Sequence, residues 1–183
     1  MNFDELVIRQ GAPTLAGLKT GCLFTWVCPS REELLGQLRR TNGQLRAKGL
    51  MLLPLGHVKE RVLLYLYRPE RLKEDLASDG EAAALLRELG YGREENRIVQ
   101  LIRRLRKSGE FPHEIGLFLG YPPEDVAGFI ENRGACCKCS GTWKVYGDPE
   151  EAQLRFRRFR SCTDCYLRQT RSGKTLSELS VAM

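Results

Sequence analysis

Residues 111–134, FPHEIGLFLGYPPEDVAGFIENRG, restrict the fold more than any other stretch of the 183-residue sequence. Pro112 suits the first turn of a helix, where its missing N–H would have no helical partner. Gly120 suits the end of that helix, because glycine adopts a positive φ at little steric cost. The two prolines that follow stop the first helix and begin a second. We therefore predict a buried helical hairpin over residues 112–133.

The second helix of this hairpin has the spacing of a DNA-reading helix. Val126, Phe129 and Ile130 fall at positions i, i+3 and i+4, which gives the helix one apolar face. A recognition helix contacts bases with its N-terminal residues, which need hydrogen-bond donors. Here those residues include Glu124 and Asp125, and no Arg, Lys, Asn or Gln. The pattern favours packing within the fold and disfavours sequence-specific DNA binding.

The remaining hydrophobic periodicity predicts an α+β fold. Strands are expected at residues 23–27, 50–55, 61–67 and 142–146, with the middle two joined through residues 56–60. Helices are expected, besides the hairpin, at residues 2–10, 30–49, 69–76, 79–90, 97–107 and 148–159. We expect one α+β domain over residues 1–183, with a cysteine-rich, basic C-terminal part at residues 134–183. Its small mixed or antiparallel sheet would have about four strands, packed by roughly six to eight helices.

The composition is typical of a soluble globular protein, with 42% hydrophobic and 28% charged residues. The N-terminal residues MNFDELVIRQ contain early acidic side chains and no apolar segment of the signal-peptide kind. The longest apolar runs, residues 50–55 and 62–67, are too short to span a bilayer. We therefore expect a cytoplasmic protein with no membrane partner, whose seven cysteines stay mostly reduced.

The net charge of +6 is concentrated near the C-terminus, where residues 133–183 contain ten Lys and Arg against five Asp and Glu. A local basic field attracts anionic partners such as RNA or a phosphorylated cofactor. A solvated basic face is the alternative interpretation. The candidate anion-binding residues are Lys144, Arg155, Arg157, Arg158 and Arg160.

Five of the seven cysteines lie in the last third of the chain. Cys136 and Cys139 form one C-x-x-C pair and Cys162 and Cys165 form another, a spacing that suits tetrahedral metals. A strand of about five residues followed by a helix of about thirteen would bring the second pair back beside the first. The 22 residues between the pairs exceed the zinc-ribbon range of about 15–20 residues. Cys137 and Cys139 are an equally available pair, so spacing does not choose between Cys136 and Cys137.

Three interpretations of these cysteines remain open. Thiolates are soft ligands, so the first is a zinc or iron site. The second is a reactive redox pair, because positive charge nearby lowers the pKa of a thiol. The third is a set of small buried side chains without chemistry. Cys22 and Cys28 flank the first predicted strand and are candidates to join the same cluster.

The segment GAPTLAGLKT, residues 11–20, invites comparison with a phosphate-binding loop. Five residues rather than four separate Gly11 from Gly17, and Leu18 precedes Lys19, so the segment is not a Walker loop. A different anion or cofactor loop remains open. An enzyme with a pocket lined by Thr14, Lys19 and His113 is a third class of function, for which the sequence offers no complete nucleophile or acid–base set.

The 111–134 segment, together with APTLAGLKTGCLF near the N-terminus and CKCSGTWKVYGDPEEA before the late cysteines, resembles an uncharacterised bacterial family. This is domain-of-unknown-function family 3793, and the resemblance covers nearly the whole chain. It implies a small cytoplasmic α+β protein of unassigned activity. Genes of the family often lie near flavodoxin and ferrous-iron genes, which implies a link to iron or redox metabolism by association.

The resemblance also implies a choice of metal ligands. It favours Cys137 over Cys136, so the implied thiolate set for zinc or iron is Cys137, Cys139, Cys162 and Cys165. Relatives often carry a His-Cys pair before the A-P-T-L run and a cysteine at the position of Thr142. This sequence has Gln10-Gly11 at the first place, so an N-terminal contribution to the site is in doubt. The leading hypothesis is a thiolate metal-binding protein, and the alternative is a binding module for an anionic partner.

Overall fold

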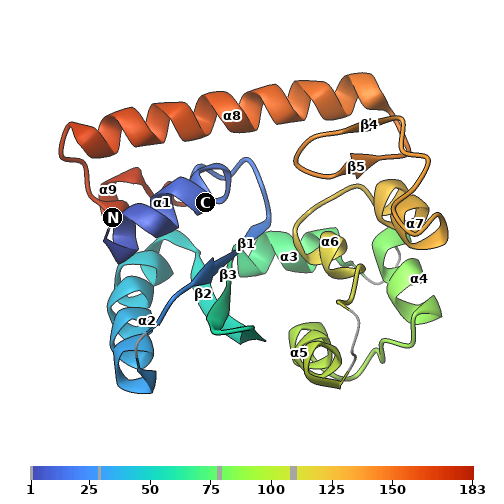
Figure 1. Ribbon diagram of the computed structural model, residues 1–183, viewed down its shortest axis with the longest axis horizontal. Coiled ribbons are helices and arrows are strands. Elements are labelled where there is room, and N and C mark those ends of the chain that lie inside the picture. Colours follow the sequence, from blue (N-terminus) through green and yellow to red (C-terminus); the bar gives the residue numbers. More distant parts are fainter. Residues whose placement is uncertain (1, 29, 78–79, 108–110) are drawn as a thin grey trace. The chain divides into compact units, whose positions relative to one another are not determined.

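The structure is a computed structural model that describes residues 2–28, 30–77, 80–107 and 111–183. The chain forms two compact units (Figure 1). Unit 1 contains Met1–Arg71 and Arg157–Met183, and unit 2 contains Leu72–Phe156. The expectation of one domain over the whole chain stays a prediction.

Unit 1 is an antiparallel three-stranded sheet with helices packed on it. Its elements are α1 (Phe3–Leu15), β1 (Gly21–Trp26), α2 (Arg31–Leu45), the 3-10 helix η1 (Arg46–Lys48), β2 (Met51–Val58), β3 (Arg61–Tyr67) and α9 (Leu176–Leu179). The strand order is β1-β3-β2, so β3 is the central strand. Gly21 pairs with Tyr67 across β1 and β3, and Met51 pairs with Tyr67 across β2 and β3. Figure 1 shows α1, α2 and α9 gathered around this sheet.

The core of unit 1 lies on one face of the sheet. Val62, Leu64 and Leu66 of β3 point into it, as their alternation along a strand requires. Side chains of α1 and α2 cover them, and Tyr166 joins the same cluster from the C-terminal part of the chain. This burial is the main driving force for unit 1.

Arg68 is buried in unit 1 and holds three separate segments together. It is 2% exposed, and its guanidinium donates hydrogen bonds to the backbone oxygens of Thr14, Leu15, Val181 and Lys48 at 2.8, 2.8, 2.8 and 3.2 Å. A planar group with five N–H donors is suited to this role. Burial lowers the pKa of Arg68 from its ordinary value.

Unit 2 is mainly helical and carries a small hairpin. Its elements are the end of α3 (Pro69–Asp75), α4 (Glu81–Glu88), α5 (Arg97–Lys107), α6 (Ile115–Phe118), α7 (Pro123–Glu131), β4 (Cys139–Ser140), β5 (Lys144–Val145) and the first part of α8 (Pro149–Arg171). The α8 helix begins in unit 2 and ends in unit 1. The strands β4 and β5 pair only with each other, in antiparallel register.

The predicted α+β class with small antiparallel sheets is confirmed, and so is the helical hairpin, as α6 and α7. The α6 helix is shorter than expected and starts at Ile115, because the preceding residues form tight turns, with Ile115 N–H donating to Pro112 oxygen. Gly120 ends it with a φ of 74°, as predicted. The α5 helix has the predicted bounds, Arg97–Lys107. The helix start expected at Asp79 lies outside the described residues.

Several boundaries differ from expectation, four of them as follows. The α1 helix continues through Pro13 to Leu15, and β2 extends through His57 to Val58, which shortens the hairpin connection to two residues. The strand expected at 142–146 is reduced to β5 and pairs outside the main sheet. The α8 helix runs twelve residues past the expected Phe159, because its buried face continues to Tyr166 and no glycine intervenes before Gly173. In the part of the chain that the structure describes, no helix has both the length and the apolar character of a membrane span.

Candidate functional site

The α6–α7 hairpin forms one wall of the candidate site in unit 2, and glycines allow its close packing. A Cβ at Gly116 would lie 2.8 Å from Val126, so α6 and α7 approach each other more closely than a larger residue allows. A Cβ at Gly128 would lie 2.5 Å from the ring of Tyr146. Glycine in a helix is unfavourable by itself, and here it is needed for contact.

Asp125 of α7 fixes the opposite wall, the segment that contains β4 and β5. It is 3% exposed and accepts three hydrogen bonds: from Trp143 Nε1 at 2.6 Å, from Tyr146 N–H at 2.6 Å and from Gly147 N–H at 2.7 Å. Short bonds to a buried carboxylate are among the stronger ones in proteins. Asp125 therefore holds the β4–β5 hairpin against α7.

A cavity of about 310 Å³ lies between these walls. We call it the aromatic cavity. Its lining residues are His113, Ile115, Gly116, Tyr121, Asp125, Val126, Phe129, Ser140, Gly141, Thr142, Trp143 and Lys144. All of them belong to unit 2.

Aromatic rings make up much of this cavity. Tyr121 stacks on Trp143 with ring centroids 4.9 Å apart, and the rings of Trp143 and Phe156 meet edge-on with centroids 4.6 Å apart. The ring of His113 lies 4.8 Å from that of Phe129. Such contacts fix ring orientations and preform the cavity.

Two basic side chains flank the rings. Lys144 donates from Nζ to the Gly134 oxygen at 2.6 Å, and the same Nζ lies 5.8 Å from the centre of the Phe129 ring. His113 is exposed at the rim. Among the described residues that line the cavity, Asp125 is the only carboxylate, and both of its oxygens accept hydrogen bonds from the protein. The site is therefore suited to anions rather than cations.

The first group of cysteines lies where the chain enters β4, with Cys136 and Cys137 in the preceding loop and Cys139 as the first residue of the strand. Cys136 is exposed with a φ of 58°, and Cys137 and Cys139 are partly exposed. Burial, together with Cys137 and Cys136, raises the pKa of Tyr146, whose hydroxyl donates to the Ala135 oxygen at 2.8 Å. These three thiols belong to unit 2, and Cys139 pairs with Val145 of β5.

The second cysteine pair lies on α8 in unit 1. Burial and the neighbouring Cys165 raise the pKa of Cys162 to about 11, so this thiol is neutral at physiological pH. Gln169 donates from Nε2 to Cys165 Sγ at 3.1 Å. Burial and the two cysteines also raise the pKa of Tyr166 to about 12. These environments do not favour thiolates by themselves, whereas a bound metal would deprotonate its ligands.

All seven cysteines are free thiols. In the described ranges, no group of three or more His, Cys, Asp or Glu side chains is arranged to hold a metal ion. Cys137 and Cys139 belong to unit 2, and Cys162 and Cys165 belong to unit 1. Cys162 and Cys165 lie within α8 itself, so this helix does not end before the second pair as expected. The four-cysteine ligand set stays a prediction.

The expected anion-binding residues fall into two groups. Lys144 lines the aromatic cavity, and Arg155 lies 5.2 Å from the centre of the Trp143 ring while donating to the Gly120 oxygen at 3.3 Å. Arg157, Arg158 and Arg160 are exposed on α8 in unit 1. Arg155 therefore supports the cavity wall.

Of the three residues expected in a pocket, Thr14 and Lys19 are buried in unit 1, at 0% and 7% exposure, and His113 lines the cavity of unit 2. Thr14 and Lys19 lie near Cys22. Burial raises the pKa of Cys22 to about 11, and the positive charge of Lys19 offsets only part of that shift.

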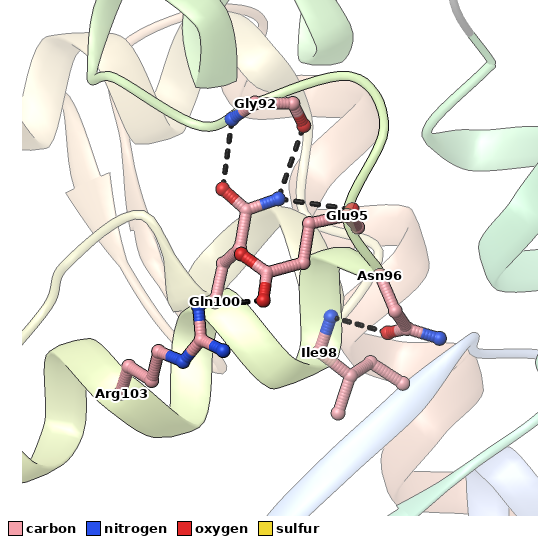
Figure 2. Close-up of polar contacts among 6 residues, drawn as sticks. All are labelled: Gly92, Glu95, Asn96, Ile98, Gln100 and Arg103. Carbon is pink, nitrogen blue, oxygen red and sulfur yellow. Dashed lines mark hydrogen bonds and ion pairs between the residues drawn. The ribbon is translucent and has the colours of Figure 1, made fainter.

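A second hollow, of about 580 Å³, lies along α5 and also includes His113. We call it the α5 hollow. Its lining residues are Leu89, Glu95, Gln100, Arg103, Arg104, Lys107, Phe111, Pro112, His113, Glu114 and Ile130. Figure 2 shows how Gln100 holds its edge: the side chain accepts from Gly92 N–H at 2.7 Å and donates to the Gly92 and Glu95 oxygens, both at 3.0 Å.

Arg104 of α5 is partly buried. Arg104 lies 4.3 Å from the centre of the Tyr91 ring, donates to the Leu89 oxygen, and approaches Glu114 at 3.5 Å. Glu114 is 7% exposed and also accepts from the Tyr91 hydroxyl at 3.1 Å. Burial, with Glu114 beside it, raises the pKa of Tyr91.

The central features of the candidate site that sequence reasoning missed are the buried Asp125 and the rings of Tyr121 and Trp143. The available signal was a carboxylate next to Val126 on the apolar face of α7. The second signal was a tryptophan between glycines in the downstream run GTWKVYG.

The fold and the two hollows define a small α+β protein with an aromatic, basic-rimmed cavity in its helical unit. A family model described as protein of unknown function (DUF3793) matches residues 7–180. The chain belongs to this family. Neither a curated protein nor a solved structure gave a significant match.

Proposed function

We propose that unit 2 is a binding module for a small anionic ligand with a planar ring, which enters the aromatic cavity. The observation that carries this proposal is the pairing of aromatic walls with the basic side chains of Lys144 and His113. The volume of about 310 Å³ is at the lower end of the range for small-molecule sites, about 300–1,000 Å³. It fits one or two fused rings with a single charged group.

The charge of the cavity supports an anion. Asp125 lines the cavity, but its oxygens accept from Trp143, Tyr146 and Gly147. A cationic ligand would therefore have to compete with three short hydrogen bonds. An anion would instead meet the Nζ of Lys144, which already lies near the Phe129 ring. A charged hydrogen bond in a partly dry site contributes about 1.5–3 kcal/mol, or roughly tenfold or more in affinity.

The probe for this proposal is 2-naphthoate, compared with the neutral 2-naphthylmethanol of similar shape. In a Trp26→Phe background, Trp143 is the remaining tryptophan and reports binding by fluorescence. We expect the carboxylate to bind about tenfold more tightly than the alcohol, and Lys144→Gln to abolish this difference.

Lys138→Gln is the matched control. Lys138 is exposed in the same segment and donates to a backbone oxygen, that of Gly147, at 2.7 Å, but it does not line the cavity. Its substitution should leave naphthoate binding unchanged. Equal binding of the two probes to the parent protein, or equal losses in the two lysine variants, would reject the proposal.

A thiolate site for zinc or iron, linked to iron or redox metabolism, is the second candidate. The supporting observation is that all seven cysteines are free thiols, with Cys137, Cys139, Cys162 and Cys165 partly exposed. Elemental analysis and a visible spectrum of protein purified without oxygen test it. Bound metal that is lost in Cys162→Ser/Cys165→Ser and kept in Cys28→Ser would support this site. Metal-free parent protein would count against it.

A further inference from the structure

The aromatic cavity and the α5 hollow share one residue, His113. His113 is exposed, and its ring is held 4.8 Å from that of Phe129. The two hollows therefore adjoin at this imidazole. The two hollows differ in chemistry, because aromatic rings line the first and charged side chains line much of the second.

The basic side chains of the α5 hollow are not equally available to a ligand. Arg104 is held by Tyr91, by Glu114 and by the Leu89 oxygen. Arg103 and Lys107 lie on the exposed side of the helix.

Arg103 forms an ion pair with Glu95 at 2.5 Å, and Figure 2 shows the two side chains meeting beside Gln100. The side chains of this pair are 60% and 40% exposed. Exposed ion pairs contribute about 0–1 kcal/mol, so an anionic ligand can replace Glu95 at small cost. The guanidinium fork of Arg103 suits a phosphate group in particular.

We propose that the ligand of unit 2 is a phosphate ester of a planar-ring compound, with the chemistry of a nucleoside diphosphate. Its ring occupies the aromatic cavity, and its phosphates extend past His113 to Arg103 and Lys107 in the α5 hollow. This inference rests on the proposed function and adds the ligand class and a second set of binding residues. The combined volume, about 310 and 580 Å³, accommodates a ring, a sugar and two phosphates.

The test compares adenosine, AMP and ADP as probes, by calorimetry on the full chain. Each added phosphate should raise the affinity at least about fivefold, and the ADP affinity should fall with added salt because the contacts are ionic. Arg103→Gln and Lys107→Gln should each lower the ADP affinity about five- to tenfold and leave adenosine binding unchanged.

Arg106→Gln is the matched control, since Arg106 is exposed in the last turn of the same helix and lines neither hollow. Circular dichroism checks that the exposed-site variants are folded. Equal affinities for adenosine and ADP, or equal effects of the Lys107 and Arg106 substitutions, would overturn this inference.

Binding of 2-naphthoate distinguishes a failure of the proposed function from a failure of this inference. If naphthoate binds through Lys144 while ADP binds no better than adenosine, the proposed function stands and this inference fails. If neither naphthoate nor ADP binds, both fail. A ten-nucleotide single-stranded RNA offers about ten equivalent binding positions, which alone would raise its apparent affinity about tenfold over that of ADP. If the RNA binds far more tightly than this, the ligand is a nucleic acid and the small-molecule inference is overturned.

Discussion

The role of Asp125 leads to the sharpest prediction for stability. In Asp125→Asn, the side-chain oxygen can still accept from Tyr146 and Gly147, but the new NH₂ group faces the Trp143 Nε1–H, which is also a donor. Two buried donors then lack an acceptor. At about 1–3 kcal/mol for each unsatisfied group, we expect a loss of about 2–6 kcal/mol in the free energy of unfolding of unit 2. That is a large part of a typical total of about 5–15 kcal/mol.

Urea unfolding in the Trp26→Phe background measures this loss through the fluorescence of Trp143. With a urea dependence of about 2 kcal/mol per M, the midpoint should fall by about 1–3 M. Glu131→Gln is the control, because Glu131 is an exposed carboxylate of the same helix. An Asp125→Asn midpoint within about 0.2 M of that control would refute the view that this carboxylate holds the hairpin.

Three further perturbations test other parts of the structure. Gly128→Ala should destabilise unit 2 by about 1–3 kcal/mol, because its Cβ would lie 2.5 Å from the Tyr146 ring. Gly36→Ala, with open space around the added Cβ, should be neutral or stabilising. Equal melting temperatures of the two variants would contradict this expectation. Cys22 keeps its proton in the folded state up to a pKa of about 11 against an ordinary 9.0, so the stability it contributes is present below pH 9 and is lost as the pH rises to 11. Between pH 9 and pH 11, the free energy of unfolding of the parent protein should therefore fall by up to about 2.7 kcal/mol more than that of Cys22→Ala. Parallel pH curves for the two proteins would show that the burial of Cys22 has no such effect. Arg68→Lys, which cannot reach four carbonyl oxygens at once, should expose the C-terminal segment to limited proteolysis, and unchanged cleavage would remove Arg68 as its anchor.

The parts of the fold that follow from local chemistry could be predicted from the sequence. The α6–α7 hairpin is punctuated by Gly120 and two prolines, and α5 has an uninterrupted apolar face. The central strand β3 contains a continuous run of apolar and aromatic residues, 62–67. Each of these signals lies within a few residues, so no knowledge of distant contacts is needed.

The candidate site depends on distant contacts and could not be predicted in the same way. Asp125 accepts from residues 18 to 22 positions later, and a carboxylate in a first helical turn is normally explained by the helix dipole alone. Lys144 was named among the basic residues for its charge. Its place beside the Phe129 ring follows only from the packing of β5 on α7. The continuation of α8 past Phe159 was missed because its buried residues are spaced among many arginines.

The order of the chain in unit 1 has a consequence for synthesis on the ribosome. Arg68 bonds to Val181, 113 residues later, and Tyr166, Leu176 and Leu179 complete the core that α1 begins. Unit 2 is continuous in sequence, so all of it is translated before those last core residues exist. At about 5–20 residues per second, its 85 residues take about 4–17 s. During that interval the first 71 residues expose an incomplete apolar core, so unit 1 is the part of the protein to which we expect a chaperone to bind.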